Sequence, residues 1–341
     1  MCTFATMDIK IVIDDKIPYI REAVAKLTPR VVYKRGADIT AADVRDADAL
    51  IVRTRTRCDE RLLAGSRGRF VATATIGFDH IDTEYMRRAG ISWTNCPGCN
   101  ASSVAQYVRS SLLLLRRDCG LEPSGATLGV VGCGHVGRLV CGVGRELGMR
   151  VLVCDPPVGA PGYVGMDVIE READVITFHV PLTDGGPCPT RHLADAAFFG
   201  RLARRPFLVN TSRGAVVDNA ALKEALREGR VRQAVIDTWE NEPGIDPELL
   251  SQVYIGTPHI AGYSADGKVN ADNMAIDALC RFFGLPNPGR IHPPRLPAGF
   301  VYDGDPLQLY NPLDDSDRLK RRPDLFEHLR GNYPLRRESV E

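Results

Sequence analysis

A regular alternation of short apolar runs with amphipathic segments restricts the fold of this chain more than any other feature. Apolar runs that are typical of buried strands recur along most of its 341 residues. Strand–helix alternation of this length implies parallel sheets joined by right-handed crossovers, so the predicted fold class is α/β. The predicted strands are 9–13, 49–53, 70–73, 91–94, 128–131, 151–154, 175–178, 207–210, 234–237 and 253–255.

Helical spacing of apolar residues separates several of these strands. We expect helices over 18–27, 101–117 and 274–283, the last of which could return the chain to its first half. The pattern changes after Gly284, where seven prolines fall between residues 286 and 312 and apolar periodicity fades. One further helix-like piece covers 325–330. A chain of this length is expected to form two or three domains.

A glycine fingerprint follows the predicted strand 128–131. Gly132 suits a tight turn, Gly134 allows backbone to approach a pyrophosphate, and Gly137 allows close packing of helix on strand. His135 and Val136 complete the loop, whose N–H groups would receive the phosphates. Asp155 ends the next strand, where its carboxylate would meet a ribose hydroxyl and repel a phosphate. The pattern therefore predicts a site for NAD rather than NADP.

Composition excludes several classes of partner. Basic and acidic residues balance at 43 each, so no broad basic field favours nucleic acid or a membrane surface. The leucine run 112–115 is far too short to span a bilayer, and the N-terminus lacks an apolar core suited to export. Ten scattered cysteines suit a reducing compartment, so we expect a cytoplasmic protein. Met7 is an alternative start to Met1.

Three candidate catalytic residues follow later strands. Arg213 lies at the carboxyl end of a predicted strand, where an arginine can form two hydrogen bonds to a substrate carboxylate. His259 has a side chain suited to taking a hydroxyl proton near neutral pH, and Glu242 could orient its ring. Each has an ordinary alternative as a surface or core residue. Their occurrence together at neighbouring strand ends favours catalysis.

The set GVVGCGHVG, CDPP, HVPLT, NTSRGAVVD, DTWENEP and PHIAGYS resembles the D-2-hydroxyacid dehydrogenase family. The resemblance implies that Arg213, Glu242 and His259 are catalytic, with His259 as the acid/base, and that NAD is the cofactor. It adds Val180, Thr211, Ser212, Arg213, Asp237 and Gly262 to the cofactor-binding positions. It also implies substrate contacts at Thr54, Thr75 and Tyr263.

The same resemblance implies a particular domain architecture. A flavodoxin-like substrate domain would comprise 7–98 and 264–285, and a Rossmann-like NAD-binding domain would be inserted as 99–263. Residues 286–341 would form a short C-terminal dimerisation segment, which makes a homodimer the expected assembly. The chain departs from the family pattern at Gln106, where many members have Glu, and at Val180, which replaces a hydroxyl residue.

The resemblance also implies that the substrate is a small phosphorylated 2-hydroxy acid. Arg53, Arg55 and Arg57 have the two-residue spacing of one strand face, which could bind a distal phosphate. A solvated edge is the alternative for that face. Arg336 and Arg337 are a second candidate for the phosphate.

Cys96 and Cys99 form a C-x-x-C pair. One pair supplies two metal ligands, and no second pair or histidine cluster completes a tetrahedral site, so no metal is expected. A thiol switch is a weaker alternative. For the whole chain two further readings stay open, a dehydrogenase for another 2-hydroxy acid and an NAD-sensing protein without catalysis.

Overall fold

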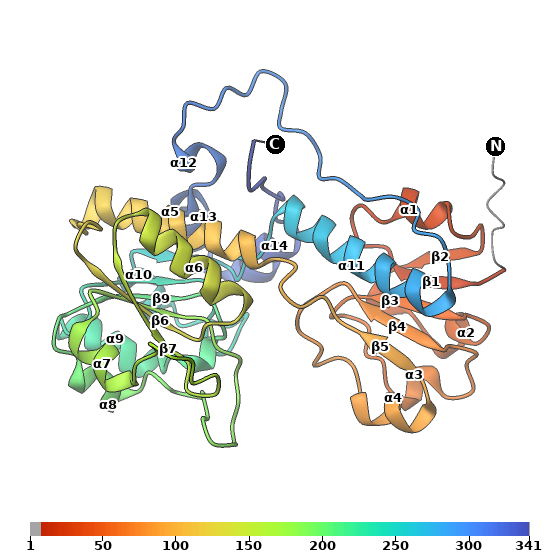
Figure 1. The fold of residues 1–341 in the computed structure, drawn as a ribbon, viewed down its shortest axis with the longest axis horizontal. Helices are drawn as coiled ribbons and strands as arrows, with labels where there is room; N and C mark the ends of the chain where they lie inside the picture. Colours follow the sequence, from red (N-terminus) through yellow and green to blue (C-terminus); the bar gives the residue numbers. More distant parts are fainter. Residues whose placement is uncertain (1–7, 341) are drawn as a thin grey trace. The chain divides into compact units, whose positions relative to one another are not determined.

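The computed structural model describes residues 8–340, so the predicted domain start at residue 7 lies outside the described part. The chain divides into two compact units. Unit 1 comprises residues up to Asn100 together with Ser264–Ala298, and unit 2 comprises Ala101–Tyr263 together with the residues from Gly299 onward. Each unit contains one wholly parallel sheet, which confirms the predicted α/β fold with two Rossmann-like domains (Figure 1).

The sheet of unit 1 has the strand order β2-β1-β3-β4-β5. This is the flavodoxin-like order, in which the chain reverses its direction across the sheet between β1 and β3. The strands are β1 Ile11–Asp14, β2 Val31–Lys34, β3 Ala49–Val52, β4 Phe70–Thr73 and β5 Ser92–Thr94.

Helices cover both faces of this sheet (Figure 1). Successive residues of β1 alternate between two cores, because Ile11 and Ile13 pack in one cluster and Val12 in the other. The cluster of Ile11 includes residues of α1 Arg21–Ala25 and α11 Ala265–Phe283. The cluster of Val12 includes residues of α2 Ala41–Val44, α3 Glu60–Leu63 and α4 Thr83–Ala89. A short 3-10 turn, η1 Gly36–Asp38, follows β2.

The sheet of unit 2 has the order β11-β10-β9-β8-β6-β7. Its first strand, β6, lies between β7 and β8, so connections leave β6 in opposite directions and open a crevice at its carboxyl end. The strands are β6 Thr127–Val131, β7 Arg150–Cys154, β8 Val175–Phe178, β9 Phe207–Asn210, β10 Gln233–Ile236 and β11 Ile255–Gly256.

Two groups of helices sandwich this second sheet (Figure 1). The core on one face includes residues of α5 Ala101–Cys119 and α6 His135–Glu146. The core on the other face includes residues of α7 Met166–Glu172, α8 Ala196–Arg201, α9 Asn219–Arg227 and α10 Pro247–Gln252. A short 3-10 turn, η2 Gly214–Val216, follows β9.

The predicted C-terminal segment is divided between the units. Residues 286–298 belong to unit 1, and those from 299 belong to unit 2, where we name residues 299–340 the C-terminal arm. Leu319 and Phe326 of this arm are buried in the unit 2 core. Its helices are α12 Pro306–Leu309, α13 Pro312–Arg321, η3 Pro323–Leu325 and α14 Phe326–Gly331. Whether the segment also serves dimerisation stays a prediction.

The cysteine pair lies inside unit 1. The Cys96 thiol donates to the backbone carbonyls of Thr73 and Ala271 at 3.4 and 3.3 Å. Burial raises the pKa of Cys96 strongly and that of Cys99 to about 11. Both thiols are therefore protonated at neutral pH, which does not favour a thiol switch. Over residues 8–340, none of the helices combines the length and apolarity that a membrane crossing requires.

Candidate active site

The fingerprint loop joins β6 to α6 with little free space. Gly132 has φ of +89°, and a Cβ there would lie 2.6 Å from the His179 carbonyl oxygen. A Cβ at Gly137 would lie 2.0 Å from the carbonyl oxygen of Gly132, so only glycine permits this approach of helix to loop. The loop opens at the N-terminus of α6, directly after Gly134. This turn suits a dinucleotide pyrophosphate.

Asp155 lies beside this loop, one residue after the end of β7. Its Oδ2 accepts a hydrogen bond from the backbone N–H of Cys133 at 2.7 Å. The half-buried carboxylate is thereby fixed at the carboxyl end of the strand next to β6. A negative charge in this position favours a ribose 2′-hydroxyl over a 2′-phosphate, which fits NAD.

The ends of β8 and β9 add polar groups on the other side of β6. The two ring nitrogens of His179 hydrogen-bond with Thr177 Oγ1 at 2.9 Å and with Thr211 Oγ1 at 3.4 Å. Burial lowers the pKa of His179 to about 3, so the ring is neutral at physiological pH. Val180 lines the same turn, with its Cγ1 facing Gly132. Sequence analysis did not single out His179.

Glu242 and His259 meet in unit 2, as a catalytic acid/base and its partner would. Nδ1 of His259 hydrogen-bonds with Glu242 Oε2 at 2.8 Å, and Glu242 Oε1 accepts from the backbone N–H of Trp239 at 2.9 Å. Burial raises the pKa of Glu242, but the hydrogen bond and charge of His259 outweigh it, and the net pKa is lowered. Glu242 is therefore ionised at neutral pH.

Hydrogen bonds to the carboxylate of Asp237 fix the loop that carries His259. His259 adopts the left-handed conformation, with φ of +57°, which costs a residue with a side chain about 1 kcal/mol. The carboxylate of Asp237 accepts from the backbone N–H groups of Ile260 and Ala261 at 2.7 and 3.0 Å, and from Thr257 Oγ1 at 2.6 Å. Asp237, predicted as a cofactor contact, thus also positions the histidine loop.

Arg213 extends from the loop after β9 and is exposed. Its Nη1 donates to the Ser212 carbonyl oxygen at 2.8 Å, and its own carbonyl accepts from Asn210 Nδ2 at 3.1 Å. Ser212 is buried, and its hydroxyl donates to Asn210 Oδ1 at 2.8 Å. The loop is therefore well fixed, while the guanidinium can reach a ligand.

The C-terminal arm contributes two arginines near the pair, Arg330, which sequence analysis did not single out, and Arg336. Nη1 of Arg330 lies 3.7 Å from Oε2 of Glu242. Arg336 is 8% exposed and donates to the carbonyl oxygens of Ile260, Ala261 and Tyr263, which follow His259 in the chain. Because these donors are engaged and buried, Arg336 is not available to a phosphate, whereas the role of Arg337 stays a prediction.

The other predicted substrate residues lie in unit 1. Thr75 hydrogen-bonds with Thr73 and donates to the Gly77 carbonyl, and Thr54 is exposed in the turn after β3. The predicted extended arginine face is wrong, because β3 ends at Val52 and the Thr56 N–H closes a turn onto the Arg53 carbonyl at 3.1 Å.

The three arginines of that turn consequently differ in environment. Nη1 of Arg53 donates to the Lys16 carbonyl oxygen at 3.0 Å, while its Nε is buried without a partner. Arg55 and Arg57 are exposed, and Arg57 forms an ion pair with Asp59 at 3.1 Å. Whether Arg53 and Arg55 contact substrate stays a prediction.

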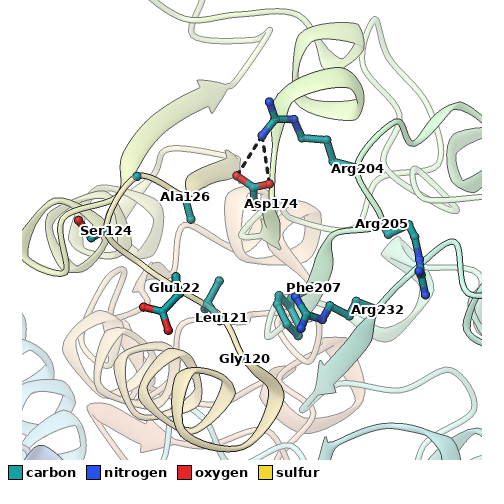
Figure 2. A pocket seen from close by; sticks show the side chains of 11 residues that line it. Gly120, Leu121, Glu122, Ser124, Ala126, Asp174, Arg204, Arg205, Phe207 and Arg232 are labelled. Atoms are coloured by element: carbon teal, nitrogen blue, oxygen red, sulfur yellow. Dashed lines mark hydrogen bonds and ion pairs between the residues drawn. The ribbon is translucent and has the colours of Figure 1, made fainter.

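A pocket at the other end of the unit 2 strands, opposite their carboxyl ends, is distinct from this site. Figure 2 shows Arg204 directed at Asp174 and Arg232 directed at the ring of Phe207. The Arg204–Asp174 ion pair spans 3.2 Å, and the Arg232 guanidinium lies 5.0 Å from the ring centre. Nε of Arg205 donates to a backbone carbonyl. The pocket lies at the amino ends of the strands, away from the loops described above.

Comparisons with known proteins agree with this geometry. Residues 100–261 match the NAD-binding domain of the D-isomer specific 2-hydroxyacid dehydrogenases. An erythronate-4-phosphate dehydrogenase of Bacteroides fragilis is 53% identical over 338 residues, covering 97% of each chain. Another, from Chromohalobacter salexigens, is 41% identical and covers 96% of this chain and 92% of its own.

Solved structures show the same architecture. D-lactate dehydrogenase from Aquifex aeolicus, complexed with NAD and lactic acid, has a TM-score of 0.65 at 25% identity and covers 81% of this chain and 96% of its own. NAD⁺-bound 3-phosphoglycerate dehydrogenase from Entamoeba histolytica has a TM-score of 0.68 at 27% identity, with coverages of 82% and 96%. The chain belongs to the D-isomer specific 2-hydroxyacid dehydrogenase family, and its cofactor is NAD.

Proposed function

We propose that this protein oxidises 4-phospho-D-erythronate at C2 to (R)-3-hydroxy-2-oxo-4-phosphobutanoate, with NAD as oxidant, in the biosynthesis of pyridoxal 5′-phosphate. Full-length relatives at 52% and 53% identity that are named erythronate-4-phosphate dehydrogenases carry this proposal. The His259–Glu242 pair supports the oxidation chemistry, because a half-buried histidine held by a carboxylate is suited to proton transfer.

In this mechanism the C2 hydroxyl gives its proton to Nε2 of His259, since Nδ1 is engaged by Glu242. The ionised Glu242 stabilises the imidazolium that forms. When bound, NAD would supply the acceptor for the hydride that leaves C2 as the C2 hydroxyl becomes a carbonyl. Arg213 holds the substrate carboxylate next to the reacting carbon.

The remaining predicted residues complete the proposal. For the cofactor we propose the fingerprint loop and Asp155, together with the ends of β8, β9 and β10 and the loop after β11. The cofactor set is Gly132, Gly134, His135, Val136, Gly137, Asp155, Val180, Thr211, Ser212, Arg213, Asp237 and Gly262. The substrate set is Thr54, Thr75, Tyr263, Arg53 and Arg55.

We also propose that the protein acts in the cytoplasm as a homodimer. The cysteines described by the structure, which cover every cysteine except Cys2, are free thiols, as suits a reducing compartment. Size-exclusion chromatography with light scattering tests the assembly. A mass of one chain would contradict the homodimer.

The decisive experiment measures NAD reduction with 4-phospho-D-erythronate beside 3-phospho-D-glycerate, with a 2-oxo acid present to reoxidise any retained NADH. A higher kcat/KM for the four-carbon acid is expected. Preference for the three-carbon acid would keep the catalytic residues and overturn the substrate. No turnover of either acid, alongside tight NAD binding, would favour the NAD-sensing alternative.

His259→Gln separates catalysis from cofactor binding. Turnover should be abolished while NAD affinity is retained. His192→Gln is a matched control, because His192 forms a second histidine–carboxylate pair in unit 2, with Glu240 at 2.7 Å. Normal turnover by His259→Gln would remove the proton-transfer assignment.

A further inference from the structure

Arg330 of the C-terminal arm lies beside the catalytic pair. Its Nη1 is 3.7 Å from Glu242 Oε2, the oxygen that also binds Nδ1 of His259. The guanidinium interacts further with the hydroxyl of Tyr263, four residues after His259. An arginine from a distant part of the sequence thus adds a positive charge to the site in unit 2.

The N–H groups of Arg330 are not saturated by the neighbouring carboxylates. Glu242 and Glu327 lie 3.7 and 3.9 Å from Nη1, which is beyond the usual hydrogen-bond distance of about 3.2 Å. The side chain is 28% exposed, and a guanidinium carries five N–H donors, more than its hydrogen bond with Tyr263 uses. Arg330 can therefore donate to an anionic ligand while its charge stays balanced by the two acids.

Other arginines of the arm differ from Arg330. Arg336 is buried and its donors serve backbone carbonyls, which fastens the arm to the loop after His259. Arg322 is 60% exposed and forms a close ion pair with Asp324. Arg330 combines proximity to the catalytic pair, partial exposure and donors available for a ligand.

The proposed substrate has two anionic groups, a carboxylate on C1 and a phosphate on C4. Arg213 is assigned to the carboxylate, so the phosphate requires another cation. The predicted strand face of Arg53, Arg55 and Arg57 is replaced by a turn, so those three side chains do not present the single cationic face that was expected. Arg330 meets the requirement from within unit 2.

We propose that Arg330 binds the substrate phosphate and that the C-terminal arm thereby selects phosphorylated 2-hydroxy acids. The proposal rests on the proposed function, which it makes more specific. One charge-assisted hydrogen bond changes binding by about tenfold to a hundredfold, and this is the size of the expected effect.

The test compares kcat/KM for 4-phospho-D-erythronate and D-erythronate in the wild type, Arg330→Gln and Arg330→Lys. Arg330→Gln should lower the ratio of the two kcat/KM values at least tenfold, mainly through KM of the phosphorylated acid. Arg330→Lys should restore part of the ratio because it keeps the charge. Arg322→Gln is the matched control and should leave the ratio unchanged. If D-erythronate turns over too slowly, its inhibition constant replaces its kcat/KM.

Two results would overturn the role of Arg330. An unchanged ratio in Arg330→Gln would show that the phosphate binds elsewhere. An equal loss with both acids would show that Arg330 supports Glu242 rather than the phosphate. Failure of the proposed function is distinguishable, because it appears in the wild type as preference for 3-phospho-D-glycerate. The same comparison with that acid and D-glycerate would then test Arg330 independently.

Discussion

Replacing Arg336 with Met should both destabilise unit 2 and loosen the loop that carries His259. Met has a similar length but no donor, so the carbonyl groups that Arg336 serves would lose their partner. The buried guanidinium donates to the carbonyl oxygens of Ser103, Ile260, Ala261 and Tyr263 at 3.2, 3.0, 2.6 and 2.8 Å, and to Gln106 Oε1 at 2.9 Å. The substitution therefore acts directly on the backbone beside His259.

The cost follows from these contacts. An unsatisfied buried acceptor costs about 1–3 kcal/mol, and water entering the site would relieve some of them. We expect the free energy of unfolding to fall by about 3–5 kcal/mol. In a unit of this size that lowers Tm by roughly 10 °C. Arg336→Lys should lose less because it keeps the charge and three donors.

The assay is thermal unfolding followed by tryptophan fluorescence, to which Trp93 of unit 1 and buried Trp239 of unit 2 both contribute, with kcat measured below the transition. Arg322→Met is the control, since an exposed ion pair contributes at most about 1 kcal/mol. We expect kcat of Arg336→Met to fall because the His259 loop is no longer fixed. A Tm within about 2 °C of the wild type, with unchanged kcat, would refute the reasoning.

Three further substitutions test individual charges. Glu242→Gln removes the charge that stabilises protonated His259, so kcat should fall by about 10²–10⁴ while NAD affinity, measured by fluorescence titration, persists. Burial lowers the pKa of His179 to about 3 in the folded protein. As pH falls below 6.5, this histidine therefore binds a proton in the unfolded chain while it stays neutral in the folded one. The free energy of unfolding should then drop by up to about 1.4 kcal/mol per pH unit. Urea unfolding at pH 7 and 5 should show a smaller drop for His179→Gln than for the wild type.

Burial raises the pKa of Asp272 to about 7, so the stability that its neutral form contributes is lost as pH rises from about 4 through 7. Asp272→Asn should raise Tm at pH 8 and not at pH 4, and an equal Tm at pH 8 would contradict the assignment.

Elements with a strong apolar pattern were predictable, and those without one were not. Strands such as β8 and β9 are buried throughout and coincide with their predicted ranges. The edge strand β2 was missed because its four residues are all half-buried and show no clear pattern. Helix α11 begins at Ala265 rather than at 274, since its first turns bury polar residues such as Asp272 and Asn273.

The same distinction applies to the candidate site. The glycine fingerprint and Asp155 are local features, because the turn and the strand end that position them are encoded within a few residues. The pairing of Glu242 with His259 could be expected from their positions at neighbouring strand ends. The prediction that the arginines of 53–57 share one strand face was wrong, because it assumed that the strand continues past Val52, where the structure has a turn.

The sequence by itself determined the α/β class, the NAD fingerprint and the family, since these depend on local spacing and on motifs that lie in single segments. Tertiary structure decided that Arg330 adjoins Glu242 and that Arg336 is buried on the His259 loop. No sequence periodicity predicts the position of either residue, because both positions follow from packing of the C-terminal arm against the rest of unit 2. Contacts between residues far apart in the chain arise only when the whole core forms, and they distinguish an arginine that can bind a ligand from one that holds the backbone.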